Sequence, residues 1–220
     1  MGPSAAMMDA PEQAAPDPDG ETPHAFLRRV TRPWHDGVEA AFERFDLRDR
    51  QGLSGFLLAQ ARAVFPLEQA LDAAGATALL PDWPARRRAA ALRADLAALG
   101  LPAPIAPSGP FLPSRDHALG ALYVLEGSRL GGRVLHRRVM NSSDVTVRSA
   151  TGFLAHQVER GWPTFLAVLD GVPSTPAAKR GLQAGADLAF NLFRLAADGA
   201  EAPGLPEAST RSGLYRHAHA

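Results

Sequence analysis

His35 has the most suggestive surroundings for chemistry, because it lies at the edge of an apolar stripe with helical spacing. Arg28 precedes it by two helical turns, and Thr31 and Glu39 lie one turn away on either side. A neutral imidazole is a common metal ligand, and its neighbours set its orientation. The pattern therefore indicates a ligand held through His35, with the positive charge of Arg28 near the ligand's edge. The alternative is a histidine without a ligand and a Glu39 that faces solvent.

Residues 119–135 have the second unusual pattern. Apolar residues recur there at helical spacing, but Gly127, Gly131 and Gly132 interrupt them. Three interior glycines cost a helix roughly 3 kcal/mol relative to alanine. One interpretation is a helix whose backbone lies close against a flat ligand. The other is a helix that ends at Gly127, followed by a turn at Gly131 and Gly132.

Several other chemistries have little support in the sequence. The chain contains no cysteine, which excludes disulfides, iron–sulfur ligation and thiolate catalysis. No Gly-x-Ser-x-Gly elbow surrounds Ser128, and no Gly-Lys-Ser/Thr follows the glycines as a phosphate loop requires. The remaining histidines form no metal-binding pattern: His24, His117, His136 and His156 are scattered, and His217 and His219 lie in an expected tail.

The charge balance also limits the function. Lys and Arg together number 23, as do Asp and Glu, so no net charge favours nucleic acid. The run of arginines at residues 86–88 predicts a solvated helix face, with docking of an acidic partner as the alternative. No apolar run is long enough to span a membrane, and residues 1–20 lack the pattern of a secretory signal. We therefore expect a cytoplasmic protein.

The periodicity predicts a single all-α, multihelical domain over residues 21–199, between tails at 1–20 and 200–220. Thr22 should cap a first helix that kinks or restarts near Pro33, Ser114 should cap the glycine-bearing helix, and Thr175 should cap the last one. The other expected segments are a helix over 53–71 broken at Pro66, a helix over 84–99, a surface loop over 100–113, a strand-like fragment over 145–147 and a helix through 162–169.

These motifs together resemble the heme oxygenase family. The pattern Leu27-x-x-x-Thr31-x-x-x-His35-x-x-x-Glu39 is similar to the proximal helix of heme oxygenases. The stretch that starts at Leu119 and reads LGALYVLEGSRLGGR is similar to the distal helix of the bacterial biliverdin-producing branch, including members that accompany bacteriophytochromes. The last helix, with Phe190, is similar to the family's closing helix. The resemblance extends from about residue 26 to residue 195.

The resemblance implies that heme lies between these two helices, with His35 as the axial iron ligand. Gly127, Gly131 and Gly132 would then let the distal backbone lie close over the porphyrin and direct bound dioxygen toward one meso carbon. Arg28 falls where the family places a basic residue for a heme propionate. The remaining candidates for contacts with heme are Arg133, Arg137 and Phe190.

The implied function is a heme oxygenase, which uses dioxygen and external electrons to convert heme to biliverdin, carbon monoxide and ferrous iron. The chain contains no dinucleotide fingerprint, so a ferredoxin or a reductase would supply the electrons, and a bacteriophytochrome could accept the biliverdin. The alternative is a non-catalytic protein of the same fold that binds or senses heme.

The sequence departs from the family pattern in two places. The animal-type branch has an aspartate immediately after the first distal glycine, and this aspartate orders a catalytic water. In this chain the position is a serine, Ser128, as in other bacterial members. In addition, no basic residue lies between Arg160 and Lys179, where some members anchor the second propionate. Ser128 is therefore the catalytic candidate, together with Gly127 and Gly131.

Overall fold

The structure, a computed structural model, describes residues 20–199, which form eleven helices and no strand. This confirms the predicted all-α fold. The expected tails lie outside the described residues, apart from Gly20. The helices are α1 (Pro23–Val30), α2 (Arg32–Glu43), α3 (Arg50–Ala73), α4 (Ala76–Leu79), α5 (Trp83–Arg86), α6 (Ala89–Ala98), α7 (Arg115–Met140), α8 (Val145–Ser149), α9 (Gly152–Ala155), α10 (Gly161–Asp170) and α11 (Pro176–Ala197).

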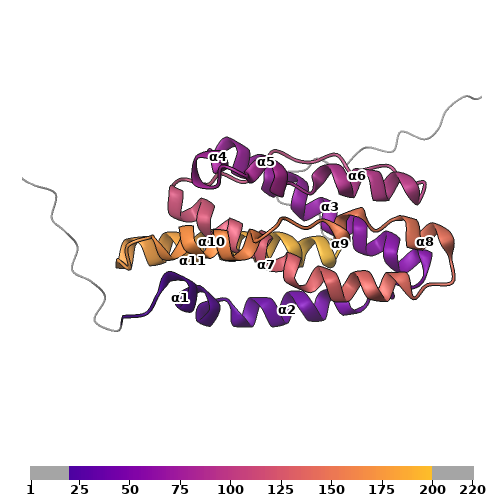
Figure 1. The fold of residues 1–220 in the computed structure, drawn as a ribbon, viewed down its shortest axis with the longest axis horizontal. Coiled ribbons are helices and arrows are strands. Elements are labelled where there is room, and N and C mark those ends of the chain that lie inside the picture. The colour runs from indigo at the N-terminus through magenta and orange to yellow at the C-terminus, as the bar shows by residue number, and fades with distance from the viewer. Residues whose placement is uncertain (1–19, 200–220) are drawn as a thin grey trace, which may run out of the picture.

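The helices are arranged in layers (Figure 1). α1 and α2 lie along one side of the molecule, α4, α5 and α6 lie along the opposite side, and α7, α10 and α11 lie between them. Among the described helices, α7 and α11 share the most extensive contact, and α11 also packs against α2 and α3. α11 is thus the common support for α2, which carries His35, and for α7, which carries the glycines. None of the helices between residues 20 and 199 has the length and apolar character needed to span a bilayer.

Local sequence signals position the helix that carries His35. The Thr22 hydroxyl accepts a hydrogen bond from the backbone of Ala25 and caps α1, as predicted. α1 ends at Val30, and α2 begins at Arg32 with Pro33 in its first turn, which confirms the expected restart. Proline suits this position because its missing N–H would have no helical partner there. His35 therefore lies near the start of α2.

Close backbone contact joins α7 and α11. A Cβ atom on Gly120 of α7 would overlap the carbonyl oxygen of Leu182, and one on Gly185 of α11 would overlap the carbonyl oxygen of His117. Glycine is needed at both positions because each faces the backbone of the other helix. The crossing buries Leu119 and its apolar neighbours on α7.

We expect Gly185→Ala to destabilise the fold, because the added methyl group must push α7 and α11 apart. Overpacking of this kind costs about 1–3 kcal/mol, which lowers the Tm of a protein of this size by roughly 2–12 °C. Gly37→Ala is the matched control: a Cβ on this exposed α2 glycine would meet no atom within 4 Å. It should stabilise α2 by up to ~1 kcal/mol. Thermal unfolding of both variants, followed by circular dichroism, checks the contrast, and equal Tm values would contradict it.

The glycine-bearing segment forms one unbroken helix, α7, through Gly127, Gly131 and Gly132. The alternative of a helix end followed by a turn was therefore wrong. The Ser114 cap is confirmed, since its hydroxyl accepts a hydrogen bond from the backbone of His117. Burial of the first half of α7 against α11 offsets the helix propensity that the glycines give up.

Two local expectations were wrong. α3 continues through Pro66, where we expected a break, because Pro66 and the residues beside it are buried in the core. Packing there outweighs the cost of about 3 kcal/mol of an interior proline. The strand-like fragment at Val145 is instead part of α8, because Asp144 caps that helix by accepting a hydrogen bond from the backbone of Thr146 at 2.7 Å.

Candidate functional site

His35 projects from a helix that buries none of its own residues completely. Its side chain is 65% exposed, and its Nδ1 atom lies 3.7 Å from carboxylate oxygens of both Asp36 and Glu39. Both distances are too long for hydrogen bonds. Both carboxylates lie on the Nδ1 side of the ring, and no carboxylate among the described residues is within ion-pair distance of Nε2. The geometry therefore suits a metal ligand that uses Nε2.

The three glycines of α7 have different surroundings. A Cβ on Gly131 would meet no atom within 4 Å, and one on Gly127 would meet only the edge of the Trp162 ring at 3.8 Å. A Cβ on Gly132, in contrast, would lie 3.2 Å from the carbonyl oxygen of Leu154. Gly131 thus leaves open space beside the helix, Gly127 faces the Trp162 ring, and Gly132 lets α9 pack closely.

Apolar side chains border this open space. Leu130 and Val134 of α7 are 56% and 53% exposed, which is unusual for large aliphatic residues on a central helix. On α2, Trp34 and Val38 are only partly buried against the core. Both helices pack on α11. Leu130 and Val134 of α7 and the His35 imidazole of α2 are thus uncovered on two helices that both pack on α11.

Arg28 lies on α1, across the kink at Thr31 from His35, and its side chain is exposed. Burial raises the pKa of the Tyr123 hydroxyl on α7, while a hydrogen bond with Thr31 and the positive charge of Arg28 oppose this rise. Arg28 is therefore close enough to α7 for its positive charge to act on the Tyr123 hydroxyl. The structure thus brings Arg28, Thr31 and Tyr123 together at one end of α2.

The other predicted site residues, Arg133, Arg137 and Phe190, do not lie at this end of α2. Arg133 and Arg137 are exposed on the second half of α7. Phe190 is buried in α11, within the core cluster that supports both α2 and α7. The structure therefore places Phe190 in the support of the site.

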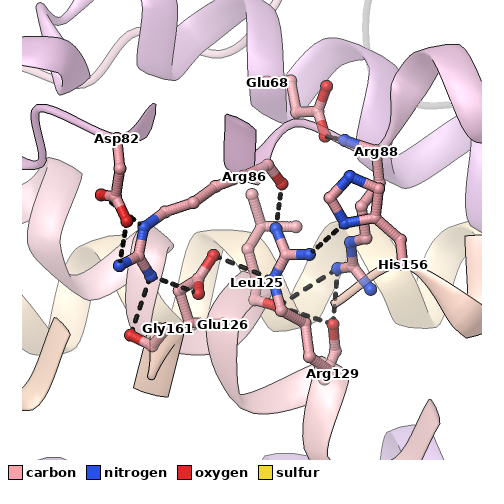
Figure 2. Close-up of polar contacts among 10 residues, drawn as sticks. Glu68, Asp82, Arg86, Arg88, Leu125, Glu126, Arg129, His156 and Gly161 are labelled. Atoms are coloured by element: carbon pink, nitrogen blue, oxygen red, sulfur yellow. Dashed lines mark hydrogen bonds and ion pairs between the residues drawn. The ribbon is translucent and has the colours of Figure 1, made fainter. Parts of the chain in front are cut away.

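An ion-pair ladder, which we define as Asp82, Arg86, Glu126 and Arg129, joins α5 to α7 (Figure 2). All of its side chains are buried except that of Asp82, which is 40% exposed. The Arg86 guanidinium donates to both carboxylate oxygens of Asp82 at 2.8 Å and to Glu126 at 2.7 Å. Glu126 also accepts from Arg129 Nε at 3.1 Å. Arg86 additionally donates to the carbonyl oxygen of Gly161, at the start of α10. The ladder thus ties α7 to two other helices.

Arg88 lies beside this ladder, and the expectation that residues 86–88 form a solvated face was wrong. Arg86 is fully buried and Arg88 is only 4% exposed, while Arg87 alone of the three is exposed. The helix ends at Arg86, and the next one begins at Ala89. This break turns two of the three side chains inward toward α7.

Arg88 fixes the hydroxyl of Ser128. Its Nη2 atom donates to Ser128 Oγ at 2.7 Å and to the carbonyl oxygen of Leu125 at 3.1 Å. The Ser128 hydroxyl donates its proton to the Leu125 carbonyl oxygen at 2.7 Å. Since a serine has one O–H donor, the hydroxyl can accept a further hydrogen bond but cannot donate one.

A small cavity of about 30 Å³ lies against Ser128 and Gly132 of α7. Its polar lining comes from Gln60, Arg88, Ser128, Arg129 and His156, and its apolar lining from Phe56, Leu135, Phe153 and Leu154. This volume is about that of one water molecule in the liquid. The cavity can therefore hold one water or one ion of similar size.

His156 is held as a neutral base at the wall of the cavity. Arg129 Nη1 lies 3.0 Å from His156 Nδ1, and because a guanidinium can only donate, Nδ1 must accept. Burial lowers the pKa of the imidazole, and the charges of Arg129 and Arg88 lower it further, so protonation is disfavoured. The N–H of the neutral ring is therefore on Nε2.

Sequence reasoning missed Arg88, Arg129, Glu126 and His156 as parts of the site. One signal was present: Glu126 and Arg129 lie within an otherwise apolar and glycine-rich helix, where buried charges require partners. Most of those partners come from other helices, 27 to 40 positions away in the sequence.

Two heme oxygenases are similar to this chain in sequence. No family model matches it. It is 32% identical over 173 residues to the heme oxygenase PigA of Pseudomonas aeruginosa, which covers 76% of this chain and 87% of that protein. It is 39% identical over 112 residues to a heme oxygenase of Xanthomonas campestris, which covers 50% of this chain and 67% of that protein.

The fold is also similar to a solved structure. The heme oxygenase of Neisseria meningitidis, crystallised with NO and CO bound, superimposes with a TM-score of 0.69 at 23% identity, over 85% of this chain and 98% of that one. The helical fold of the described residues is thus the fold of this solved heme oxygenase. The chain belongs to the heme oxygenase family.

Proposed function

We propose that this protein is a heme oxygenase, which cleaves heme to biliverdin, carbon monoxide and ferrous iron with dioxygen and external electrons. Its similarity to PigA over most of both chains carries the assignment to the activity. The exposed His35 and the open glycine face of α7 support the assignment of the site. When bound, heme supplies the iron that activates dioxygen and is itself the molecule that is oxidised.

The residues between α2 and α7 fit heme. His35 would hold the heme iron, since its imidazole is exposed on α2. Leu130 and Val134 supply apolar contact for a porphyrin face, which would cover side chains that are otherwise exposed to water.

Gly127 and Gly131 keep the distal side open. We expect Gly131→Leu to raise the Tm of the heme-free protein, because leucine has a helix propensity up to ~1 kcal/mol better and meets no atom there. The same side chain should lower the affinity for hemin on the order of 10-fold or more, since it occupies the ligand's space. Gly131→Ala should give a smaller change of each kind. Thermal unfolding tests the rise in Tm, and a spectroscopic hemin titration tests the fall in affinity. An unchanged affinity for hemin would show that the ligand does not lie against Gly131.

Ser128 holds a water as a hydrogen-bond acceptor. Its own proton is bound to the Leu125 carbonyl oxygen, so a water in the cavity must donate to Ser128 Oγ. That water keeps a second hydrogen for the distal side, and Ser128 thereby orients a proton source without a carboxylate. Ser128, Gly127 and Gly131 are the catalytic candidates in this arrangement.

Basic residues hold the propionates. Arg28 is exposed near the end of α2 and can form charge-assisted hydrogen bonds with a carboxylate. Arg133 and Arg137 are exposed on α7 and are the candidates for further polar contacts. Phe190 supports both helices of the site from within α11.

The reaction requires electrons from a separate protein. We propose a ferredoxin or a reductase in the cytoplasm as the donor, and a bacteriophytochrome as an acceptor of the biliverdin. The net charge of zero supports a role without nucleic acid.

Addition of hemin to the purified protein, followed by ascorbate and catalase in air, tests the function. We expect a hemin complex whose Soret band decays as a broad red biliverdin band grows. A Soret band that persists would contradict turnover and favour the non-catalytic heme-binding alternative. The absence of any complex would overturn both functions.

A further inference from the structure

Arg88 is a buried cation without a counter-ion. No carboxylate among residues 20–199 forms an ion pair with its guanidinium, which instead contacts Ser128, the Leu125 carbonyl oxygen and the face of the Phe153 ring at 4.6 Å. The nearby Glu68 carboxylate is directed at backbone N–H groups, those of Arg88 at 2.6 Å and Ala89 at 3.2 Å. Burial, and after it the positive charge of Arg129, lower the pKa of Arg88 to about 9, although the charges of Glu126 and Glu68 oppose this shift.

No neighbouring carboxylate is paired directly with Arg88. In the ion-pair ladder, the carboxylates of Asp82 and Glu126 are already bound to the guanidiniums of Arg86 and Arg129. The Glu68 carboxylate is paired with Arg87 at 3.7 Å and accepts from two backbone N–H groups. Three guanidiniums therefore meet two fully paired carboxylates, and one positive charge remains. A buried charge of this kind is costly unless a partner neutralises it.

The cavity lies where such a partner would bind. Arg88 and Gln60 both line it, and both carry N–H donors. Only the Nη2 atom of the Arg88 guanidinium makes hydrogen bonds within the described residues, so the donors on Nη1 and Nε remain for a ligand. The volume of about 30 Å³ is enough for one small ion.

We propose that this cavity is a binding site for one small monovalent anion, such as chloride. The anion neutralises Arg88 and accepts its remaining N–H donors. The anion competes for this space with the water that Ser128 would orient. A higher halide concentration should therefore displace that water from the cavity. The site exists in the heme-free chain and does not depend on the proposed function.

Thermal unfolding of the full-length, heme-free chain tests the proposal. Sodium chloride or bromide is compared with sodium gluconate at the same ionic strength and pH 7.5, so that general screening is equal. We expect a saturable rise in Tm of about 2–4 °C when halide reaches roughly five times its Kd. Arg88→Gln should abolish the rise. Arg93→Gln is the matched control, because Arg93 also stacks on an aromatic ring, at 4.2 Å from Phe65, but is exposed; it should retain the rise.

Bromide anomalous diffraction provides a second measurement if Arg88→Gln fails to fold. Crystals of the unmodified chain grown with bromide should show an anomalous peak in the cavity, within hydrogen-bond distance of the Arg88 guanidinium. No peak there at a bromide concentration that saturates the unfolding response would overturn the proposal, as would equal Tm values in halide and gluconate.

Discussion

Replacing His35 with alanine is expected to abolish axial ligation of heme. His35 is the exposed imidazole on α2. The affinity for hemin should fall by more than the ~10–100-fold that loss of an outer hydrogen-bond partner costs a metal site. Absorption spectroscopy of a hemin titration should show a shifted and weaker Soret band.

Rescue and a control make this result specific. Added imidazole should restore the Soret band of His35→Ala, because a free ligand can occupy the space that the deleted side chain leaves. His117→Ala removes a histidine at the far end of α7, where it is hydrogen-bonded to Ser114, and should leave the spectrum unchanged. A His35→Ala complex with the affinity and spectrum of the unmodified chain would show that another residue binds the iron.

Glu126→Gln is expected to produce the largest loss of stability. Glu126 is buried between Arg86 and Arg129, at 2.7 Å and 3.1 Å. Its neutralisation leaves two buried guanidiniums with only Asp82 as a counter-charge. Breaking a buried ion pair from one side costs about 3–5 kcal/mol, which corresponds to a fall in Tm of roughly 6–20 °C for a protein of this size.

An exposed carboxylate serves as the control for this variant. Glu43→Gln removes a charge from the surface of α2 and should change the stability by less than ~0.5 kcal/mol. Urea unfolding gives both free energies. A Glu126→Gln variant as stable as Glu43→Gln would contradict the view that the ladder anchors α7.

The parts of the site that the sequence predicted depend on local signals. The Thr22 cap and Pro33 define where α1 and α2 begin, and those limits place His35 near the start of its helix. The apolar spacing from Leu119 to Leu125 predicted the buried half of α7. Caps and periodicity act over a few residues, so one sequence suffices to read them.

The parts that sequence reasoning missed depend on distant contacts. A run of arginines at residues 86–88 suggested a solvated face, yet two of these side chains are buried because Glu126, Ser128 and Gly161 meet them from other helices. Nothing within a few residues of Arg86 indicates those partners. The charge of Glu126 inside an apolar helix was the only local sign that a buried partner exists.

The roles of the α7 glycines could also be predicted only in part from the sequence. Their number in α7 indicated a close approach of some kind, but only the structure distinguishes an open face at Gly131 from backbone contacts at Gly120 and Gly132. Each contact requires a residue from another helix, either α11 or α9. Sequence alone therefore assigned all three glycines of the motif to one role.

The crystal structure of the hemin complex tests the central claim most directly. We predict heme between α2 and α7, with the iron at bonding distance from His35 Nε2 and the opposite porphyrin face against Gly127 and Gly131. Heme bound elsewhere on the molecule, or an iron ligated by a residue other than His35, would contradict the account.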